Sequence, residues 1–387
     1  MKTNWPIKKL GEVSTVLSGG TPKTGMPSFW NGDILWLTPK ELSNCRDIYI
    51  DDTDRKITSE GLKNSSAKLL PKGTVLLTTR APIGYVAIAG KELTTNQGFK
   101  NFVCDSKQLD NQYLYYWLNS NTKYLQSLGQ GATFGEINKT NVERIEIPIP
   151  PLPIQQKIVE RLDAIRKAQE LNDLQISKTQ ELFESLMQKE VFDSKLKEIS
   201  LDEVVLKQEF MDPKKLPEKE FNYVDISSID RYSRQILFFK RIVGKNAPSR
   251  ARKKIRDGDT VWSTVRPYLK NIAHVISLPE LKVASTGFCI LSSQKEVLDH
   301  NWLYYNVSSD WFIQKILPYQ KGASYPAVSD QDILSQTIKL PPFEEQQKIV
   351  AKLSAIQDYK KSLLKQKALL KELFDSVLHE SMAGKLD

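Results

Sequence analysis

Basic side chains gather in one stretch of the chain. Between residues 240 and 256 the sequence has eight Lys and Arg residues and no acidic one, namely Lys240, Arg241, Lys245, Arg250, Arg252, Lys253, Lys254 and Arg256. Clustered cations bind DNA phosphates because they release the counterions that condense on the duplex. Gly244, Pro248 and Ser249 predict a loop here. We expect this loop to contact phosphates, and the alternative is a solvated surface.

A second set of residues has the chemistry needed to read bases. Arg, Lys, Asn, Gln, Ser and Thr present fixed donor and acceptor patterns when tight loops hold them. Two Thr-x-Arg turns, which contain Arg80 and Arg266, and two glycine-containing loops, 130–134 and 320–325, offer such positions. Any single member could instead stabilise its own turn, so the prediction concerns the set. With the phosphate-binding candidates, the set is Thr21, Lys23, Lys40, Arg80, Asn96, Gln97, Lys100, Gln130, Thr133, Arg250, Arg252, Lys253, Lys254, Arg266, Tyr268, Lys270, Asn271, Lys321, Ser324 and Tyr325.

The sequence patterns that would indicate catalysis are incomplete. Residues 84–92 resemble a P-loop, but five residues separate the glycines instead of four, and Glu92 stands where a magnesium-binding Ser or Thr belongs. Asp259 with residues 280–282 imitates a nuclease triad that has no counterpart in the other half of the chain. Each histidine lacks a Cys or carboxylate partner at metal-ligand spacing, which holds for His274, His300 and His379. We therefore predict a binding protein with no catalytic residue, no metal site and no cofactor of its own.

The elements that must position these residues are organised by an internal duplication. PPLPIQQKIVERLDAI, residues 150–165, matches PPFEEQQKIVAKLSAI, residues 341–356, at ten of sixteen positions with an offset of 191. The same offset pairs GATF with GASY, ELFESLM with ELFDSVL and LGEV with LDEV. Between these anchors the offset slips, to 186 where TRAPIG meets TVRPYL and to 189 where NQGF meets STGF. Each half is therefore a variable block followed by a shared block.

Each variable block mixes short strand patterns with turns and one clear helix, which predicts an α+β fold. The expected strands are 34–38, 74–79 and 85–89 in the first half and 223–226, 260–263 and 288–291 in the second, with helices at 111–118 and 301–307. The predicted organisation is two α/β recognition domains and two helices, at residues 1–150, 151–195, 196–340 and 341–387.

The shared blocks predict two long helices that end near residues 190 and 379. Apolar residues recur every three and four positions, which is the pattern of a coiled-coil seam. About 35 residues at about 1.5 Å each span about 50 Å, more than the width of a 150-residue domain. An ordinary helix packed on a globular core is the alternative. Chain connectivity predicts antiparallel helices and a pseudo-two-fold arrangement.

The seam residues of the first copy are Ile158, Leu162, Ile165, Gln169, Asn172, Ile176, Thr179, Phe183 and Leu186. Those of the second are Ile349, Leu353, Ile356, Lys360, Leu363, Lys367, Leu370, Phe374 and Val377. Three central polar residues in the first copy would weaken a symmetric homodimer. We expect this helix to pack on its sister and on helices of a partner.

Composition points to a polyanionic partner. Lys and Arg outnumber Asp and Glu by 55 to 46, which gives a net charge of +9. The three cysteines are far apart in sequence, so neither a disulfide framework nor a Cys-x-x-Cys metal pair is available, and this predicts a reducing compartment. Because the first residues lack an apolar leader and no apolar run is long enough to span a membrane, we expect a cytoplasmic protein.

These motifs make the chain resemble the DNA-specificity subunit of type I restriction-modification systems. The doubled PPxxxQQKIV signature carries the resemblance. The opening WPIKKLGEVSTVLSGGTPKT with WNGDILWLTPKEL, within residues 5–42, is similar to the first recognition domain of that family. The resemblance covers the whole chain in order. The second recognition domain departs from the first almost throughout, as expected when two heads read different half-sites.

The resemblance implies a bipartite, asymmetric DNA target and a set of partners. Two modification subunits, which are adenine methyltransferases, would bind the helices, and restriction subunits able to translocate DNA with ATP would join them. S-adenosylmethionine, ATP and Mg²⁺ would then bind to the partners. Two other interpretations stay open: a stand-alone nuclease or type IIB-like fragment, and a scaffold that sequesters modification subunits without reading DNA.

Overall fold

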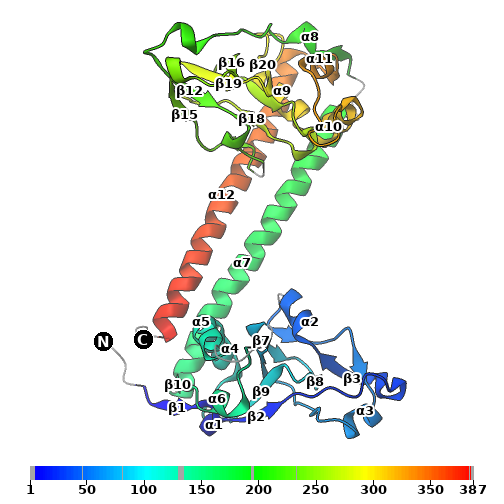
Figure 1. The fold of residues 1–387 in the computed structure, drawn as a ribbon, viewed down its shortest axis with the longest axis vertical. Coiled ribbons are helices and arrows are strands. Elements are labelled where there is room, and N and C mark those ends of the chain that lie inside the picture. The colour runs from blue at the N-terminus through cyan, green and yellow to red at the C-terminus, as the bar shows by residue number, and fades with distance from the viewer. Residues whose placement is uncertain are drawn as a thin grey trace. The chain divides into compact units, whose positions relative to one another are not determined.

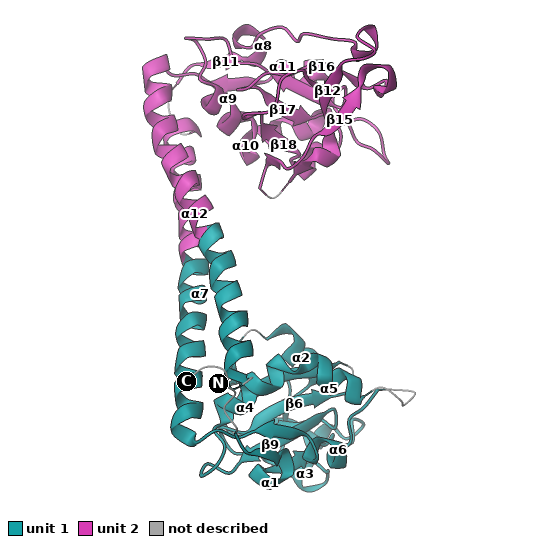
Figure 2. Cartoon of the chain, turned by 90° about the vertical axis from the view of Figure 1, so that its left-hand side faces the viewer, with its two compact units in different colours: residues 1–174, 364–387 teal, residues 175–363 magenta. Residues whose placement is uncertain are grey.

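The computed structural model describes residues 5–45, 47–80, 82–129, 135–192, 196–231, 233–382 and 384. The chain divides into two compact units, which Figure 2 shows in different colours. Unit 1 comprises residues 1–174 with 364–387, and unit 2 comprises residues 175–363. Each unit therefore contains one variable block and a part of both long helices. No helix within the described ranges is both long and apolar enough to cross a membrane.

Unit 1 is built around a five-stranded sheet with the order β2-β9-β6-β7-β4, in which only β4 and β7 run parallel. A three-stranded sheet, β5-β3-β8, and the pair β1-β10 complete it. The strands are β1 (Ile7–Lys9), β2 (Ser14–Ser18), β3 (Trp30–Leu37), β4 (Tyr49–Ile50), β5 (Lys56–Ile57), β6 (Val75–Thr79), β7 (Ile83–Ala89), β8 (Thr94–Thr95), β9 (Phe99–Cys104) and β10 (Glu146–Pro148). The helices are α1 (Leu10–Val13), α2 (Pro39–Asn44), α3 (Ser59–Lys63), α4 (Asn111–Ser120), α5 (Thr122–Leu128) and α6 (Lys139–Glu143), with the 3-10 turn η1 (Pro27–Phe29).

Strand β6 shows why this core forms. Its side chains alternate between the two faces of the sheet: Val75 and Leu77 join a buried cluster with α4, whereas Leu76 joins a second cluster with β3. A strand buried on both faces has a continuous apolar pattern. The Asp110 carboxylate starts α4 by accepting from the amides of Gln112 and Tyr113 at 2.8 and 3.0 Å.

Unit 2 has a four-stranded sheet, β15-β12-β19-β16, a three-stranded sheet, β18-β17-β20, and the pairs β13-β14 and β11-β21. The strands are β11 (Glu198–Ser200), β12 (Glu220–Val224), β13 (Ile229–Asp230), β14 (Gln235–Ile236), β15 (Lys240–Val243), β16 (Ala251–Lys254), β17 (Thr260–Ser263), β18 (Ile272–His274), β19 (Lys282–Ser285), β20 (Phe288–Leu291) and β21 (Thr337–Lys339). The helices are α8 (Leu201–Val204), α9 (His300–Val307), α10 (Asp310–Ile316) and α11 (Asp330–Leu334). Short 3-10 turns are η3 (Pro213–Lys215), η4 (Ile226–Ser228), η5 (Gly244–Asn246), η6 (Pro267–Leu269) and η7 (Leu317–Tyr319).

The predicted strands and helices are present, with ends shifted by a few residues. The expected strand at 223–226 ends at Val224, and Ile226 begins the turn η4. The basic run was predicted as a loop, and this is right only for its middle, where the turn η5 and residues 247–250 contain Gly244, Pro248 and Ser249. The two ends of the run form the edge strands β15 and β16, because Ile242 and Ala251 pack into a buried cluster with Phe221.

A buried glutamine joins each long helix to its own unit. Gln155 accepts from the Asp110 amide at 2.8 Å and donates at 2.8 Å to the carbonyls of Gln108 and Pro150. Gln346 in unit 2 accepts from the Asp299 amide at 2.8 Å and donates at 2.9 Å to two carbonyls, those of Val297 and Pro341. These bonds give the first glutamine of the doubled QQKIV motif a structural role.

The two long helices, α7 (Leu152–Met187) and α12 (Phe343–Met382), are the longest elements of the chain (Figure 1). A π-helical turn, η2 (Gln188–Phe192), extends α7. In unit 1 they run antiparallel, because Gln169 donates to the Leu370 carbonyl at 3.1 Å and Asp173 pairs with Lys367 at 2.7 Å. The same holds in unit 2, where Lys360 donates to Gln180 at 2.6 Å and Lys352 pairs with Glu190 at 3.8 Å.

The apolar stripe had two interpretations, a coiled-coil seam and a helix packed on a globular core, and each describes a part of α7 and α12. Ile158 and Leu162 enter the core of unit 1, and Ile349 and Leu353 enter the core of unit 2. Further along, seam positions are polar: Asn172 and Thr179 are buried, and Lys360 is half-buried. The stripe therefore packs on the globular part of a unit near each helix start and faces the sister helix in the middle. Near each helix end it packs on a globular core again, through Phe183 and Leu186 in unit 2 and through Phe374 and Val377 in unit 1.

Candidate nucleic-acid interface

In unit 1 a polar sheet edge lies where β6 ends and β9 begins. The Thr79 amide donates to the Gly98 carbonyl at 2.8 Å, and the Thr79 hydroxyl donates to the same oxygen at 3.3 Å. The Gly98 amide donates to the Asn96 side-chain oxygen at 2.8 Å. The Ile137 amide donates to the Thr79 carbonyl at 3.0 Å. This set, Thr79, 96–98 and Ile137, is called the unit 1 edge.

Unit 2 repeats this arrangement where β17 ends and β20 begins. The amide and hydroxyl of Thr264 donate to the Gly287 carbonyl at 2.9 and 3.0 Å, and the Gly287 amide donates to the Ser285 hydroxyl at 3.2 Å. The Val328 amide donates to the Thr264 carbonyl at 2.9 Å. This set, Thr264, 285–287 and Val328, is called the unit 2 edge. The two edges share a hydrogen-bond pattern and differ in side chains.

Several predicted residues lie at the unit 1 edge. The Thr21 hydroxyl donates to the Gln97 side chain, and the exposed Arg80 pairs with Glu136 as an isolated β-bridge. The amide oxygen of Asn96 is used by the Gly98 turn. Lys23 and Lys40 are exposed, on the loop before η1 and on α2. Two further predictions, Gln130 and Thr133, lie outside the described residues.

Lys100 does not fit the role predicted for it. Its side chain is buried behind the unit 1 edge, 3.6 Å from the Glu136 carboxylate and 3.5 Å from the Thr79 hydroxyl. Burial lowers the pKa of Lys100, and Glu136 opposes that shift. A buried ammonium with these partners holds the segment around Glu136 in place, and it offers no surface to a phosphate.

At the unit 2 edge two predicted loops come together. The Arg266 guanidinium lies 4.8 Å from the centre of the Tyr325 ring and donates to the Ser324 carbonyl at 3.3 Å. The Arg266 amide donates to the Pro326 carbonyl at 2.7 Å, with Arg266 in the left-handed region at φ 51°. Tyr325 is 71% exposed. An arginine stacked on an exposed aromatic ring is a preformed donor for a base or phosphate.

Four other predicted residues surround this pair. Lys321 is exposed and closes its loop through two backbone bonds of 2.9 Å with Ala327. Tyr268 is exposed on η6, and the carbonyl of Asn271 accepts from the Ser263 amide at 3.0 Å. Lys270 forms an ion pair with Asp310. Lys321 and Tyr268 are therefore more accessible than Asn271 and Lys270.

The two Thr-x-Arg arginines are not equivalent, which corrects the sequence pairing. Thr79 and Thr264 make the matching bonds, so Arg80 corresponds to Val265. Arg80 and Val265 also occupy matching bridges, with Glu136 and Ala327. Arg266 stands one position further on. The sequence alignment of TRAPIG with TVRPYL was off by one residue because nothing in the residue types distinguishes the two registers.

Most cations of the basic run are already paired within unit 2. Asp225 binds Lys240 at 2.6 Å, and Glu209 binds Lys254 at 2.9 Å and also Arg256. The remaining pairs join Lys245 to Glu218, Arg252 to Asp212 and Lys253 to Asp330. Each of these cations therefore already has a carboxylate beside it that offsets part of its positive charge.

Two consequences follow for phosphate binding. Lys253 is 4% exposed and also donates to the Phe288 carbonyl at 2.6 Å. It is therefore a structural residue, and its prediction as a DNA-binding residue is wrong. In the described part of the chain, no ion pair is seen at Arg241 or Arg250, and both are exposed. The Arg250 carbonyl accepts from the Thr286 amide at 2.8 Å, which places Arg250 beside the unit 2 edge.

The patterns set aside as catalytic remain unassembled. Residues 83–89 form strand β7, so the P-loop-like stretch makes no loop before a helix. The Asp259 carboxylate binds the Arg256 amide at 2.7 Å, and burial raises its pKa. His274 and His300, expected to be isolated, lie ring to ring at 4.9 Å, and burial lowers the pKa of His274 to about 4. No group of three or more possible metal ligands occurs in the ranges described.

The fold and the doubled edge define a class of protein, one that repeats an α+β recognition unit with one long helix per repeat. The family described as "Type I restriction modification DNA specificity domain" matches residues 2–181 and 193–372. The chain belongs to this family, which confirms the resemblance carried by the doubled motif.

Curated relatives agree with this placement, and solved structures share the fold. The chain is 41% identical over 188 residues to the MjaIX specificity subunit of Methanocaldococcus jannaschii, a match that covers 47% of this chain and only 43% of that protein. It is 25% identical to the MjaVIII specificity subunit of the same organism, over 99% of this chain and 93% of that protein. The crystal structure of a type I S subunit from M. genitalium has the same fold, with a TM-score of 0.59, 16% identity and coverage of 98% and 96%.

Proposed function

We propose that the chain reads a bipartite, asymmetric DNA sequence, with one half-site for each unit. The doubled edge carries this proposal. One threonine and glycine framework holds Arg80 in unit 1, whereas in unit 2 it holds Arg250 and the stacked Arg266. Backbone frameworks fix the position of a reader, and side chains set which base it accepts. Two copies with different side chains suit a target whose halves differ.

The chain itself is proposed to be non-catalytic. Methylation and cleavage then belong to modification subunits, which are methyltransferases that bind S-adenosylmethionine, and to restriction subunits, which bind ATP and Mg²⁺. The complex would act on DNA in the cytoplasm. We also propose the domain limits that the sequence predicts. They place the recognition domains at residues 1–150 and 196–340 and the helices at residues 151–195 and 341–387.

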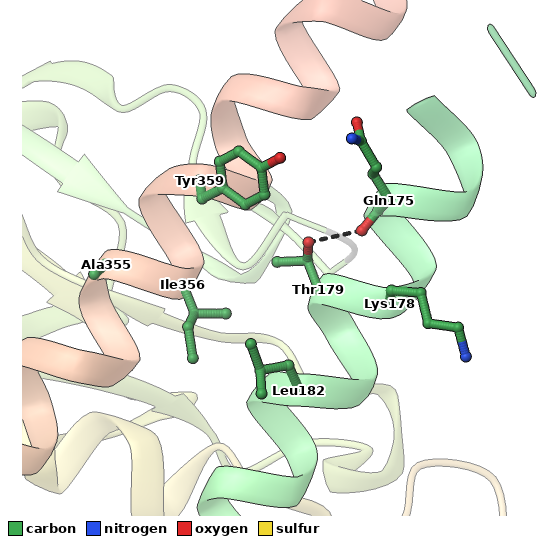
Figure 3. Close-up of a pocket in the computed structure, with 7 residues that line it drawn as sticks. All are labelled: Gln175, Lys178, Thr179, Leu182, Ala355, Ile356 and Tyr359. Atoms are coloured by element: carbon green, nitrogen blue, oxygen red, sulfur yellow. Dashed lines mark hydrogen bonds between the residues drawn. The ribbon is translucent and has the colours of Figure 1, made fainter. Parts of the chain in front are cut away.

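The long helices are the proposed binding surface for two modification subunits. In unit 2 an apolar groove of about 420 Å³ lies between α7 and α12, as Figure 3 shows. It is lined by Gln175, Lys178, Thr179, Leu182, Ala355, Ile356 and Tyr359. In unit 1 the helices expose Leu171, Leu174, Leu364, Leu369 and Leu373. Apolar side chains beside a seam suit the knobs-into-holes packing of additional helices.

The methylation pattern of cells that express this chain with its modification partner tests the proposal. We expect one motif, made of two short specified blocks separated by unspecified bases. A continuous motif, or methylation that does not depend on sequence, would contradict two-site reading. Cleavage of DNA by the isolated chain with Mg²⁺ would favour the nuclease interpretation instead.

A further inference from the structure

A loop of unit 1, residues 19–28, begins beside the unit 1 edge. Gly19 and Gly20, at the start of the loop, lie in close contact with neighbouring backbone atoms. A Cβ on Gly19 would lie 1.9 Å from the Asn96 carbonyl oxygen, and a Cβ on Gly20 would lie 2.3 Å from the Ala67 amide nitrogen. The Gly20 amide donates to the Thr95 carbonyl at 2.8 Å. Only glycine fits such contacts, so the loop starts from a fixed point beside residues 96–98.

Two tryptophans hold the rest of this loop. The Trp36 indole donates to the Gly20 carbonyl at 2.9 Å, and the Trp30 indole donates to the Lys23 carbonyl at 3.3 Å. The two rings meet edge to face, with centres 4.9 Å apart. The Met26 amide closes the tip by donating to the Lys23 carbonyl at 3.2 Å. Residues 23–26 are therefore exposed yet held in place.

Arg55 lies on the same tryptophans. Its guanidinium carbon is 3.9 Å from the Trp30 ring centre and 4.8 Å from that of Trp36. The Arg55 carbonyl also accepts from the Trp36 amide at 3.1 Å, which fixes its backbone. Arg55 is exposed, and within the described ranges no ion pair with a carboxylate is seen at Arg55 or at Lys23.

This geometry suits base recognition. Stacking on an indole uses the face of a guanidinium and leaves its in-plane N–H groups available, and these groups match the O6 and N7 acceptors of guanine in the major groove. Holding the side chain in advance also lowers the entropy lost when it binds. The paired cations of the basic run lack the first of these features, since carboxylates occupy some of their donors.

We propose that Arg55 is a base-contacting residue of unit 1, presented by Trp30 and Trp36 beside a loop, 19–28, that follows the DNA backbone. The inference rests on the proposed function. No feature of the sequence near Arg55 singles it out, because its partners lie 19 and 25 residues away.

The test compares three variants of the full chain, each expressed with its modification partner, by the methylated motif that they produce. Arg55→Ala is expected to reduce discrimination at one base pair of one half-site by about 5- to 140-fold, the value of a bidentate contact. Arg55→Lys keeps the charge but loses the bidentate geometry, so it should also lose most of the discrimination. Lys72→Ala, which removes an exposed cation from the turn before β6, should leave the motif unchanged.

The other half-site serves as an internal check, because it should match the wild type in all three variants. The unfolding temperature should match the wild type in Lys72→Ala and fall only slightly in the Arg55 variants, which lose a cation–π contact of about 0.5 to 1 kcal/mol. Wild-type preference at every position in Arg55→Ala would overturn the assignment and leave the proposed function standing. A uniform loss of methylation at all sequences would also overturn it, since that is the result for a phosphate contact. A wild-type chain that directs no sequence-specific methylation would overturn both.

Discussion

At the scale of single residues, five lysines and arginines of this chain show two contrasting kinds of surroundings. Lys100 and Lys253 are buried with carboxylate partners and hold segments of their own units in place. Arg55, Arg250 and Arg266 are more accessible, and no carboxylate neutralises them in the described part of the chain. Sequence shows only that all five are basic. The pairing depends on acidic residues that are distant in sequence, such as Asp330 for Lys253.

Unpaired cations should contribute most to phosphate binding. Replacing Arg241 and Arg250 by Ala is expected to weaken binding to all sequences alike and to flatten the salt dependence by up to about 0.9 in log–log slope for each phosphate that is no longer neutralised. The matched variant, Lys245→Ala with Lys254→Ala, removes two cations that Glu218 and Glu209 already pair. Its slope should change less. DNA titrations of the assembled complex across salt concentrations measure both, and equal slopes would contradict this distinction.

Arg266 should act on one base pair. Arg266→Lys keeps the charge but loses the planar fork stacked on Tyr325, so it is expected to reduce discrimination at that pair by about 1 to 3 kcal/mol. Dissociation constants for the cognate site and its single-base variants provide the measurement. Tyr325→Phe is the control, because the ring is retained. A loss of affinity that is the same for every sequence would show that Arg266 contacts only phosphate.

At the scale of elements, the apolar patterns were sufficient to predict most strands and helices. β6, β17 and β20 were visible because their side chains are buried. The turn in the middle of the basic run was predicted from the sequence, but the two short strands at its ends were not, because their charged side chains pair with distant acids such as Asp225 and Asp212. The one-residue slip between Arg80 and Arg266 had the same origin, since register is set by bonds to distant residues such as Gly98 and Gly287.

The buried glutamines should be stabilising elements of the helix junctions. Gln155→Ala leaves the Asp110 amide and two carbonyls without their partner, so it is expected to lower the free energy of unfolding by about 2 to 4 kcal/mol. Gln156→Ala alters the exposed neighbour and should cost less than about 0.5 kcal/mol. Denaturant unfolding of the two variants compares them. Similar values for both would mean that the motif is retained for another reason.

At the scale of the whole molecule, the duplication could be predicted from the sequence because its shared blocks begin with a stretch that is identical at ten of sixteen positions. Which positions of the two recognition units correspond could be predicted only in part from the sequence. NQGF and STGF indicated a common origin, and the matching bonds of Thr79 and Thr264 identify which positions correspond. Arg55 could not be predicted from the sequence, because a cation–π contact requires no fixed spacing between the residues that form it.

The helices are expected to set the distance between half-sites. Inserting one heptad after Ile176 and one after Leu363 keeps both apolar stripes in phase and adds roughly 10 Å. At about 3.4 Å per base pair, the gap in the methylated motif should lengthen by about three base pairs. The insertion also rotates one half-site around the duplex, so binding should weaken unless the DNA twists or bends. A folded variant that keeps the original gap would rule out this role.

Two-site reading is tested most directly by exchanging one recognition domain. Replacing residues 1–150 with the corresponding domain of a related specificity subunit, and sequencing the methylated motif of cells that express the chimera with the modification partner, separates the two half-sites. We predict that one half-site takes the sequence read by the donor while the other half-site and the gap stay as in the wild type. A change in both half-sites, or in neither, would contradict it.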